Sequence, residues 1–356
     1  MTEAILMKNL LKKFLCCFLL LVVILFSACA EYTPKGAAPA QEALRVYFID
    51  VGQADCALIT EGAHAMLIDG GNAADAPEII DYLQSLKISH LDIVVATHAH
   101  EDHIGGLSKI IDTFSTGTVY TPVKEYDSAC FRAFLSSAGE KLTTAQKGMT
   151  WQLGKAEISV LWPQTPIDIE NTNNTSIVLR LVYGSISFLF TGDLEADAES
   201  KLAQSEAALS STVLKVGHHG SATSSSYTFL RRVLPQFAVI SCGAGNSYGH
   251  PEEATLSRLA QAEAQIYRTD QCGTILVQTD GDTLTFRFGD TVFTASPAPP
   301  ATPALENDGA YIGNLKSKKF HLPSCSALPA EDNRVYFAAR ETALAQGYTP
   351  CSNCKP

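Results

Sequence analysis

The sequence predicts an α/β protein in which two β-sheets pack face to face and helices cover the outer faces. Three observations predict this fold class. The first half opens with three short apolar segments bounded by glycine-rich breaks, as in a β-meander. The second half alternates segments of helical and strand periodicity. Both halves are β-rich with interspersed helices, which is typical of a sandwich flanked by helices.

The first half supplies the meander and the first helices. Strands are expected over residues 44–50, 55–60 and 65–69. Residues 77–86 have helical spacing, and the apolar run 91–96 is expected to be a buried strand. A further helix is expected over residues 105–111. Residues 42–295 form the main domain, which is long enough to bury one large core.

The second half begins with a hairpin about Tyr183-Gly184. Helix and strand then alternate, and a final two-stranded meander turns on Asp280-Gly281-Asp282. No repeat of 20–50 residues is visible. The expected strands are 177–182, 185–190, 213–216, 237–241, 273–279 and 283–288, and the expected helices are 195–206, 224–234 and 251–262.

The most informative segment directly follows the strand expected over 91–96. This segment, residues 97–106, contains three of the nine histidines of the chain. A solvated polar loop would not be expected to contain so many. A loop directs several donors to one place, whereas a strand would send alternate side chains to opposite faces. Imidazole and carboxylate bind divalent ions such as zinc. The segment is therefore a predicted metal site, with the ligands His98, His100, Asp102 and His103.

The spacing H-x-H-x-D-H followed by Gly-Gly resembles the signature loop of the metallo-β-lactamase superfamily. This resemblance implies a metallo-β-lactamase-like αββα sandwich with one or two metal ions at the rim of the sheets. Members of the superfamily split β-lactams, thioesters, lactones or phosphodiesters. The loop therefore indicates the chemistry better than the substrate.

Further motifs accompany this loop in the order that the family has them. Together they resemble the hydrolase-like domain of the ComEC DNA-uptake family, and the resemblance covers residues 42–295. The motifs are Phe48–Asp55 and Leu67–Gly71 before the loop, and Asn173–Ser176, Phe190–Asp193, Leu214–Ser221 and Tyr248–Pro251 after it.

The resemblance implies a role for each metal ligand. It assigns His98 and His100 to a first ion, Asp102 and His103 to a second ion, and Asp193 to a position between the two. The implied cofactors are two divalent ions, zinc or manganese, which share the hydroxide that attacks the substrate. A turn-forming role is the alternative for Asp193, because Gly-Asp is common in loops.

Two ligand positions stay open. His218 is assigned to the second ion from the family motif, and His219 is the alternative, because adjacent histidines cannot easily reach the same ion. Many members of the superfamily carry another histidine before the Gly-Asp motif, and this chain lacks it. Asn174 or water is expected to take that place on the first ion.

Other polar residues of the motifs are expected to contact the substrate or to support the ligands from behind. The candidate catalytic residues are Asp102, His250 and Lys215. His250 is interpreted as a supporting donor, a proton donor to the leaving group or a helix cap, and Lys215 as a phosphate contact or a solvated edge residue. Ligand support is expected from Asp50, Gln53, Asp55, Asp69, Asn174, His219 and Ser221. Turn stabilisation is the alternative for the first four, and a phosphate contact is a further interpretation of Ser221.

A separate metal-ligand pattern closes the chain. His321 and Cys325, followed by Cys351 and Cys354, give H-x3-C and C-x2-C, which are typical of a closed structural zinc site. Residues 309–356 resemble the zinc-binding domain of the Ada DNA-repair family. His321 stands where that domain has its alkyl-accepting cysteine, so alkyl transfer is expected to be lost and zinc binding kept. A disulfide is the alternative in an oxidising compartment.

The first 29 residues are expected to be an export signal. Three lysines precede an apolar run over 14–26, which is short for a membrane span. Phe26-Ser27-Ala28-Cys29 resembles a lipoprotein cleavage site, so Cys29 is the expected lipidation site and membrane anchor. Full secretion is the alternative, and either route places the protein outside the cytoplasm. Flexible linkers are expected over 30–41 and 296–308.

The charge of the chain argues against a broad duplex-binding surface. The net charge is −11, and loss of the signal, with its three lysines and one glutamate, makes it −13. Duplex binders usually present a basic surface. Bound divalent ions would make the site itself locally more positive.

The sequence thus predicts an exported dinuclear hydrolase that cleaves phosphodiesters in extracellular DNA or nucleotides. One alternative is hydrolysis of a lactone, a thioester or a β-lactam. The other is a non-catalytic surface module that binds DNA. No protein partner is inferable from the sequence.

Overall fold

The computed structural model describes residues 43–167, 169–297, 311–330, 333–337 and 340–356. The expected export signal, Cys29, the first linker and most of the second linker lie outside the described residues. Within the described ranges, no helix has the length and apolar character that crossing a bilayer requires.

The first sheet contains nine strands in the described part of the chain. The predicted meander is present, with antiparallel pairing that aligns Val46 with Ile59 and Ile59 with Met66. Strands β3 to β6 then run parallel to one another. The order across the sheet is β16 (Thr291–Ala295), β15 (Leu284–Phe288), β14 (Ile275–Thr279), β1 (Leu44–Phe48), β2 (Ala57–Glu61), β3 (His64–Ile68), β4 (His90–Val95), β5 (Ser115–Thr121) and β6 (Leu142–Thr144).

The second sheet contains seven strands among the described residues. Its β9–β10 hairpin turns at Tyr183-Gly184, as predicted, and pairs Tyr183 with Ile186. Strands β10 to β13 are parallel. The order is β13 (Gln265–Arg268), β12 (Phe237–Ile240), β11 (Val213–Lys215), β10 (Ile186–Phe190), β9 (Val178–Tyr183), β8 (Ala156–Trp162) and β7 (Thr150–Leu153).

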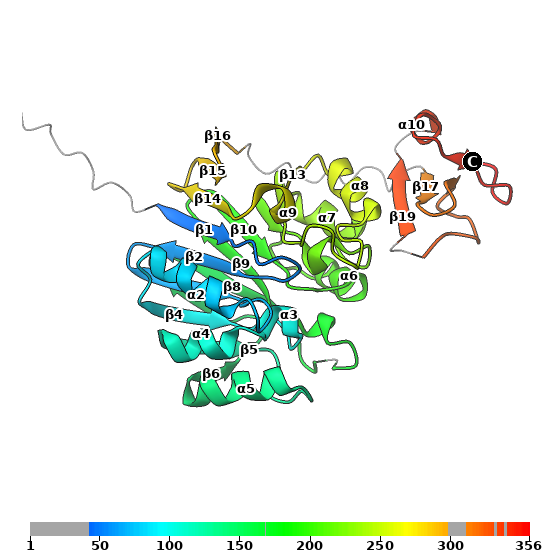
Figure 1. The fold of residues 1–356 in the computed structure, drawn as a ribbon. Helices are drawn as coiled ribbons and strands as arrows, with labels where there is room; N and C mark the ends of the chain where they lie inside the picture. The colour runs from blue at the N-terminus through cyan, green and yellow to red at the C-terminus, as the bar shows by residue number, and fades with distance from the viewer. Residues whose placement is uncertain (1–42, 168, 298–310, 331–332, 338–339) are drawn as a thin grey trace, which may run out of the picture. The chain divides into compact units, whose positions relative to one another are not determined.

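Helices cover the outer face of each sheet (Figure 1). The α-helices are α2 (Ala76–Ser85), α3 (Glu101–Ile104), α4 (Leu107–Thr113), α5 (Ala129–Ala138), α6 (Ala196–Gln204), α7 (Tyr227–Val233), α8 (Glu253–Gln261) and α9 (Thr269–Cys272), and the short 3₁₀ turns are η1 (Gly139–Lys141), η2 (Asn173–Thr175) and η3 (Gly217–Gly220). Their starts follow local rules. Pro77 lies in the first turn of α2, and the Ser128 hydroxyl caps α5 by accepting from the N–H of Phe131.

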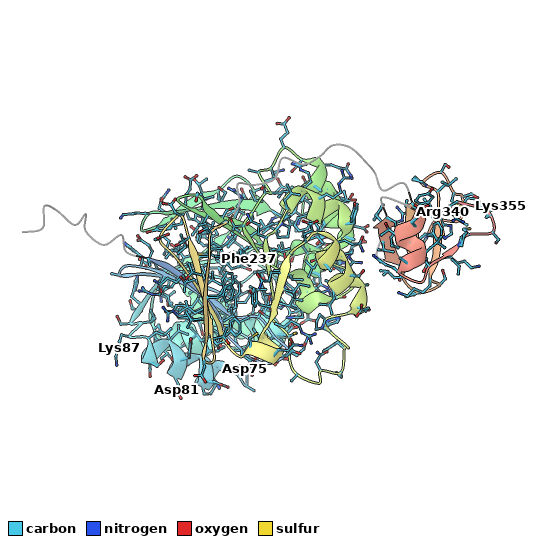
Figure 2. The ribbon with its side chains drawn as sticks, turned by 90° about the horizontal axis from the view of Figure 1, so that it is seen from above. Asp75, Asp81, Lys87, Phe237, Arg340 and Lys355 are labelled. Carbon is cyan, nitrogen blue, oxygen red and sulfur yellow. The ribbon has the colours of Figure 1, made fainter. Side chains whose placement is uncertain are left out.

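Three hydrophobic cores separate the four layers. The middle core joins the two sheets and includes Phe48 and Phe237. A second core packs the first sheet against α2, α4 and α5, and a third packs the second sheet against α6, α7 and α8. In Figure 2, Phe237 lies in the interior, whereas Asp81 and Lys87 lie at the outer edge of the α2 layer. The predicted αββα sandwich is confirmed.

The helix predicted over 105–111 differs from the observed structure. The chain forms the short helix α3 before Gly105-Gly106 and the helix α4 after it. A Cβ atom on Gly106 would lie 2.2 Å from the carbonyl oxygen of Gly70, and one on Gly105 would lie 2.4 Å from the nitrogen of Ala73. Glycine is needed here for close backbone approach. The loop after β3 therefore packs directly against the loop after β4.

The C-terminal residues form a small module. Its strands are β17 (Tyr311–Asn314), β18 (Lys319–His321), β19 (Arg334–Phe337) and β20 (Thr349–Pro350), in the order β19–β17–β18–β20, with the helix α10 (Arg340–Ala345). Its apolar core consists of Phe320, Val335, Phe337, Ala343 and Tyr348. The sequence had predicted a small zinc-binding module here, and this part of the fold is also confirmed.

Candidate metal centres

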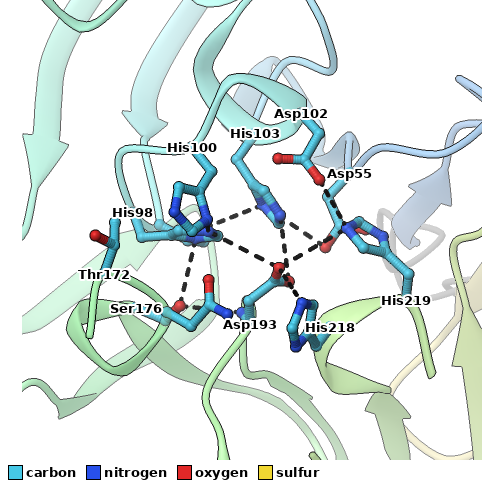
Figure 3. A network of polar contacts seen from close by, with 12 residues as sticks. Asp55, His98, His100, Asp102, His103, Thr172, Ser176, Asp193, His218 and His219 are labelled. Atoms are coloured by element: carbon cyan, nitrogen blue, oxygen red, sulfur yellow. Dashed lines mark hydrogen bonds and ion pairs between the residues drawn. The ribbon is translucent and has the colours of Figure 1, made fainter. Parts of the chain in front are cut away.

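The main candidate site lies where parallel strands of both sheets end. Strands β3 and β4 are parallel, as are β10 and β11, and the carboxyl ends of parallel strands share one edge of a sheet. Asp69 follows β3, the histidine-rich loop follows β4, Asp193 follows β10, and His218 and His219 follow β11. Figure 3 shows the labelled histidines of both loops gathered around the Asp193 carboxylate.

Four of these residues form a compact ligand set. Ligand atoms of Asp102, His103, Asp193 and His219 all lie within 4.8 Å of one another. His103 Nε2 is 3.2 Å from Asp193 Oδ1. His219 Nε2 is 3.2 Å from Asp102 Oδ2 and 3.8 Å from Asp193 Oδ2. One divalent ion is suited to such a set of two imidazoles and two carboxylates.

His98 and His100 form a second group beside the same aspartate. His98 Nε2 lies 3.1 Å from His100 Nδ1 and 3.8 Å from Asp193 Oδ2. Asp193 Oδ2 therefore faces both groups, the position that an oxygen shared by two ions would take. The structure brings together five of the six residues that the resemblance placed on the two ions, and the sixth, His218, is considered below.

Buried polar atoms provide a test of whether ions fit here. Among the described residues, His103 Nε2 and Asp193 Oδ1 are buried and make no hydrogen bond of good geometry. Buried polar atoms normally have a hydrogen-bond partner, and an exception indicates that a water or an ion takes that place. The donor chemistry and these two atoms fit a divalent ion.

Carboxylates and hydroxyls hold the ligand imidazoles from behind. Asp69 accepts from the backbone N–H and hydroxyl of Thr97, at 2.8 and 2.7 Å, and its Oδ2 is 2.8 Å from His103 Nδ1. His219 Nδ1 lies 3.1 Å from the Ser241 carbonyl oxygen. Since Nδ1 of each imidazole is occupied, Nε2 of each is directed to the cluster. Such partners fix the ring orientation of metal-binding histidines.

Lys215 does not contact the site opening. Its ammonium is buried and donates to Asp55 Oδ2 at 2.8 Å and to the Val216 carbonyl at 3.0 Å. Asp55 Oδ1 in turn lies 3.4 Å from His219 Nδ1. The prediction that Lys215 contacts a phosphate is therefore corrected: it neutralises the buried carboxylate that supports His219. Its strand is central to the sheet, so the lysine is not a solvated edge residue either.

The electrostatics differ between the two groups. Burial, together with the neighbouring His103, holds the pKa of His98 well below its usual value, so this imidazole is neutral near pH 7. Burial alone would also lower the pKa of His219, but the carboxylates of Asp193 and Asp55 raise it to about 10. Burial opposes ionisation of Asp102, yet His103 and the His219 hydrogen bond lower its pKa to about 2. The second group therefore exists as charged pairs before an ion binds.

The two adjacent histidines have an unusual backbone. His218 (φ 52°, ψ 45°) and His219 (φ 52°, ψ 21°) are both left-handed, which costs of order 1–3 kcal/mol for each non-glycine residue. Their ring centroids lie 6.3 Å apart at an interplanar angle of 64°. The compact set contains His219 and not His218. The assignment of His218 to the second ion is corrected in favour of the alternative, because the left-handed turn directs the two rings to different places.

Three of the residues predicted to support the ligands instead stabilise turns. Asp50 Oδ1 accepts from the Gly52 N–H. Asn174 Oδ1 accepts from the Glu195 N–H at 3.0 Å. Ser221 Oγ accepts from the Thr223 N–H. Of the predicted set, Asp55 and Asp69 contact the ligand imidazoles directly, and His219 is itself a member of the compact ligand set.

Gln53 and His250 form the outer rim of the site. Gln53 Oε1 accepts from the Gly243 N–H, and its Nε2 lies 3.5 Å from His250 Nδ1. The His250 ring meets the His218 ring edge to face at 5.7 Å and stacks with Tyr248 at 5.7 Å. Burial, followed by the neighbouring His218, lowers the pKa of His250. The lowered pKa favours the neutral form of His250, which argues against its role as the proton donor to a leaving group.

Sequence reasoning missed the residues that hold His218 and His98. His218 Nδ1 lies 3.1 Å from Thr223 Oγ1 and 3.5 Å from Glu195 Oε1. Ser176 Oγ lies 3.4 Å from His98 Nδ1 and accepts from the Asp193 N–H at 3.0 Å. The available signal was position: Glu195 and Thr223 each lie within five residues of a motif ligand in the sequence.

The C-terminal module contains the second candidate metal site. Ligand atoms of His321, Cys325, Cys351 and Cys354 lie within 4.8 Å of one another. His321 Nδ1 is 3.3 Å from Cys325 Sγ. Every cysteine in the described part of the chain is a free thiol, so the structure does not pair these residues in a disulfide. One imidazole and three thiols match a closed structural zinc site.

Two protein families match the chain. The family described as the metallo-β-lactamase superfamily matches residues 49–244. The family described as the metal binding domain of Ada matches residues 304–356. These matches imply divalent metal binding in the main domain and zinc binding in the tail.

Several curated relatives match about 70% of the chain. The chain is 29% identical to ComE operon protein 3 of Bacillus subtilis over 72% of this chain. It is 32% identical to the competence protein ComA of Neisseria gonorrhoeae over 71%, and 30% identical to recombination protein 2 of Haemophilus influenzae over 69%. The chain covers 34%, 34% and 30% of these relatives, about a third of their length.

A solved structure also resembles the chain. The metallo-β-lactamase fold protein YhfI from Bacillus subtilis gives a TM-score of 0.45 at 12% identity, covering 71% of this chain and 100% of that one.

Proposed function

Because the chain belongs to the metallo-β-lactamase superfamily, we propose that it is a metal-dependent phosphodiesterase that cleaves single-stranded DNA or nucleotides. The observation that carries the proposal is the compact ligand set of Asp102, His103, Asp193 and His219, in a chain that is 29–32% identical to competence proteins. The names of those relatives refer to competence and recombination, which makes nucleic acid the first substrate class to test.

Two groups of residues in the site would each hold one ion. His103, Asp193 and His219, with Asp102, would hold one ion, and His98 and His100 would hold the other beside Asp193. When bound, two divalent ions would lower the pKa of a water and neutralise charge on a phosphate. Asp69 and Asp55 keep the imidazoles oriented for this task.

The site is open to solvent on the side of Asp102. The His98 and His103 side chains are completely buried, whereas the Asp102 side chain is 33% exposed. His100, His218 and His250 are half-buried around it. A substrate is therefore expected to enter over Asp102 and to meet the rim that His250 and Tyr248 form.

Tyr248 favours a single-stranded substrate. It is 71% exposed and stacks on His250, which contacts His218. An exposed aromatic ring can stack on any nucleobase, at about 1–3 kcal/mol per base. The net charge of −11 disfavours duplex binding, while a stacked base needs no broad basic surface.

Export with a lipid anchor at Cys29 remains part of the proposal. The proposal rests on the lipoprotein-like end of the signal sequence. Incorporation of a labelled fatty acid by the producing cell, and its loss in Cys29→Ala, would test it. Label that persists in Cys29→Ala would contradict the anchor.

The activity is tested with the purified full chain in manganese or zinc. We expect cleavage of single-stranded DNA and of bis(p-nitrophenyl) phosphate, and loss of both in Asp102→Ala. His90→Ala is the matched control, because His90 is exposed and contacts Ser115 and Asp92, away from the site. Activity on neither substrate would contradict the proposal, as would full activity in Asp102→Ala.

Two alternatives are outcomes of the same assay. Short segments match hydroxyacylglutathione hydrolases, for example at 34% identity over 18% of this chain, so a panel of thioesters, lactones and β-lactams belongs beside the nucleic acids. Hydrolysis in that panel alone would identify an ester or amide hydrolase. DNA binding that survives a His98→Ala, Asp193→Ala double variant, without hydrolysis in the wild type, would identify a binding module.

A further inference from the structure

We infer that His218 is a ligand of the first ion, in the place of the histidine that this chain lacks before its Gly-Asp motif. Adjacent His218 and His219 would thus each complete a different ion. The inference rests on the two-ion centre of the proposed function and adds an assignment of its own. Its basis is the position and partners of the His218 ring.

The first group needs another ligand, and the second does not. Asp102, His103, Asp193 and His219 already give the second ion four ligand residues. The first group has His98 and His100 beside the shared Asp193. A further imidazole therefore belongs with the first group.

The segment expected to supply that ligand is engaged elsewhere. Asn174 Oδ1 accepts from the Glu195 N–H, and the Asn174 carbonyl oxygen accepts from the Trp162 indole at 2.7 Å. Ser176 Oγ lies against Nδ1 of His98, on the opposite side of the ring from Nε2. Neither side chain presents an oxygen to the ion face of His98.

The His218 ring, unlike the Asn174 side chain, faces the Asp193 carboxylate. Its Nε2 lies 3.7 Å from Asp193 Oδ2, as far as the Nε2 atoms of His98 and His219 lie from the same oxygen, at 3.8 Å each. Figure 3 shows the His218 ring directed to the Asp193 carboxylate. Three imidazoles around one shared oxygen are the arrangement expected when that oxygen bridges two ions.

The partners of Nδ1 favour ligation through Nε2. His218 Nδ1 faces Thr223 Oγ1 at 3.1 Å and Glu195 Oε1 at 3.5 Å. Glu195 is itself fixed, because Asn171 Nδ2 donates to it at 2.6 Å and Asn173 Nδ2 at 3.1 Å. A carboxylate behind an imidazole is a common support of metal-binding histidines. His98, His103 and His219 share this pattern of an occupied Nδ1.

The strained backbone explains how the adjacent residues His218 and His219 could bind different ions. His218 and His219 are consecutive left-handed non-glycine residues, and their ring planes differ by 64° with centroids 6.3 Å apart. Strain of this kind is concentrated at functional sites. It allows two adjacent side chains to reach neighbouring places in one centre, whereas a strand would send them to opposite faces.

The test counts metal in the full chain after equilibrium dialysis against zinc. His218→Asn removes the imidazole and keeps a residue that tolerates left-handed geometry. We expect His218→Asn, His98→Ala and their double variant each to lose the same single equivalent, because both residues hold one ion. His219→Asn combined with His98→Ala should lose two. Asn174→Ala is the control and should lose none.

Two results would overturn the assignment. His218→Asn with wild-type metal content and affinity would do so, and so would loss of two equivalents from the His98→Ala, His218→Asn double variant. If a variant fails to fold, anomalous diffraction from the zinc-loaded wild type decides. The account requires His218 Nε2 at a bonding distance of about 2.0–2.1 Å from the ion that His98 binds. The numbers of bound zinc ions test the His218 assignment separately from the proposed function, because a protein without phosphodiesterase activity would still bind both ions.

Discussion

The metal centre of the main domain and the C-terminal metal site differ in how the metal and the fold depend on each other. In the main domain, ligands follow β4, β10 and β11, strands that extensive cores stabilise whether or not an ion is bound. In the tail, a core of five residues supports the ligands, and so small a core is marginal by itself. The fold positions the ions in the first case, whereas the ion completes the fold in the second.

The donor chemistry agrees with this division. The main centre uses imidazoles and carboxylates and leaves the Asp102 side chain 33% exposed, so a substrate can approach. The tail uses one imidazole and three thiols, a closed set that leaves no ligand position for a substrate. One site is suited to chemistry and the other to stability.

Metal removal should give the largest difference in stability between the tail and the main domain. Structural zinc contributes about 10–16 kcal/mol of apparent binding energy in small zinc modules, so we expect chelator to unfold the tail while the sandwich stays folded. Hydrogen exchange of the full chain is the measurement. Amides of β17 and β18 should lose protection and those of β4 should keep it, and Cys351→Ser should reproduce the tail effect alone. Equal loss of protection in both regions would remove the distinction.

Breaking the buried Lys215–Asp55 pair should destabilise only the sandwich. Lys215→Met leaves the Asp55 carboxylate buried without its cation, at a cost of about 3–5 kcal/mol. Chemical denaturation followed by tryptophan fluorescence reports on Trp151 and Trp162, both in the main domain. Lys201→Met is the control, because Lys201 is exposed on α6. Similar denaturation midpoints for the two variants would show that Lys215 is not needed as a counter-ion.

Weakening the support of His103 should lower metal affinity without changing the fold. Asp69→Asn replaces the carboxylate that faces His103 Nδ1 at 2.8 Å. Loss of such a partner typically reduces metal affinity about 10–100-fold. Competition with a chromogenic chelator measures this change. We expect the zinc affinity of the tail to stay constant, and an unchanged main-domain affinity would argue against a supporting role for Asp69.

Truncation of the exposed rim should affect binding of nucleic acid more than hydrolysis of a small ester. Tyr248→Ala removes one stacking surface of about 1–3 kcal/mol, which corresponds to roughly 5–150-fold in KM for single-stranded DNA. The rate on bis(p-nitrophenyl) phosphate should stay the same, because that substrate has no base to stack. If both substrates lose activity equally, Tyr248 acts on the centre itself.

The metal-free protein should lose stability at alkaline pH through His219. The folded pKa of about 10 lies above the ordinary value of 6.5 because Asp193 and Asp55 outweigh burial. This stabilisation is complete below pH 6.5 and is lost as pH rises through about 10. Thermal unfolding of metal-free protein between pH 7 and pH 10 should show a larger fall in Tm for wild type than for His219→Asn. Parallel curves would contradict the charged pair.

The sequence predicted much of this fold because its signals are local. The loop His98–His103 and the Gly-Asp turn at Asp193 lie at strand ends, and strand ends could be read from apolar runs. The long segment between α4 and η2 carried no motif, so β5, β6, β7, β8 and α5 were not predicted. The edge strand β16 was also missed.

The site assignments that failed depended on the third dimension. Lys215 looks like an exposed strand residue until β10 and β12 enclose β11 and Asp55 meets its ammonium. The choice between His218 and His219 depended on two left-handed backbone conformations that no periodicity reveals. Asn174 is a plausible ligand in sequence and a helix-entry cap in the structure.

A metal count on the purified full chain tests the central claim most directly. After dialysis against zinc, mass spectrometry should find three equivalents in wild type and two in a variant with Cys325, Cys351 and Cys354 changed to serine. The second number reports the main domain alone, without cutting the chain. Fewer than two equivalents in that variant would contradict a centre in which Asp193 joins two ions.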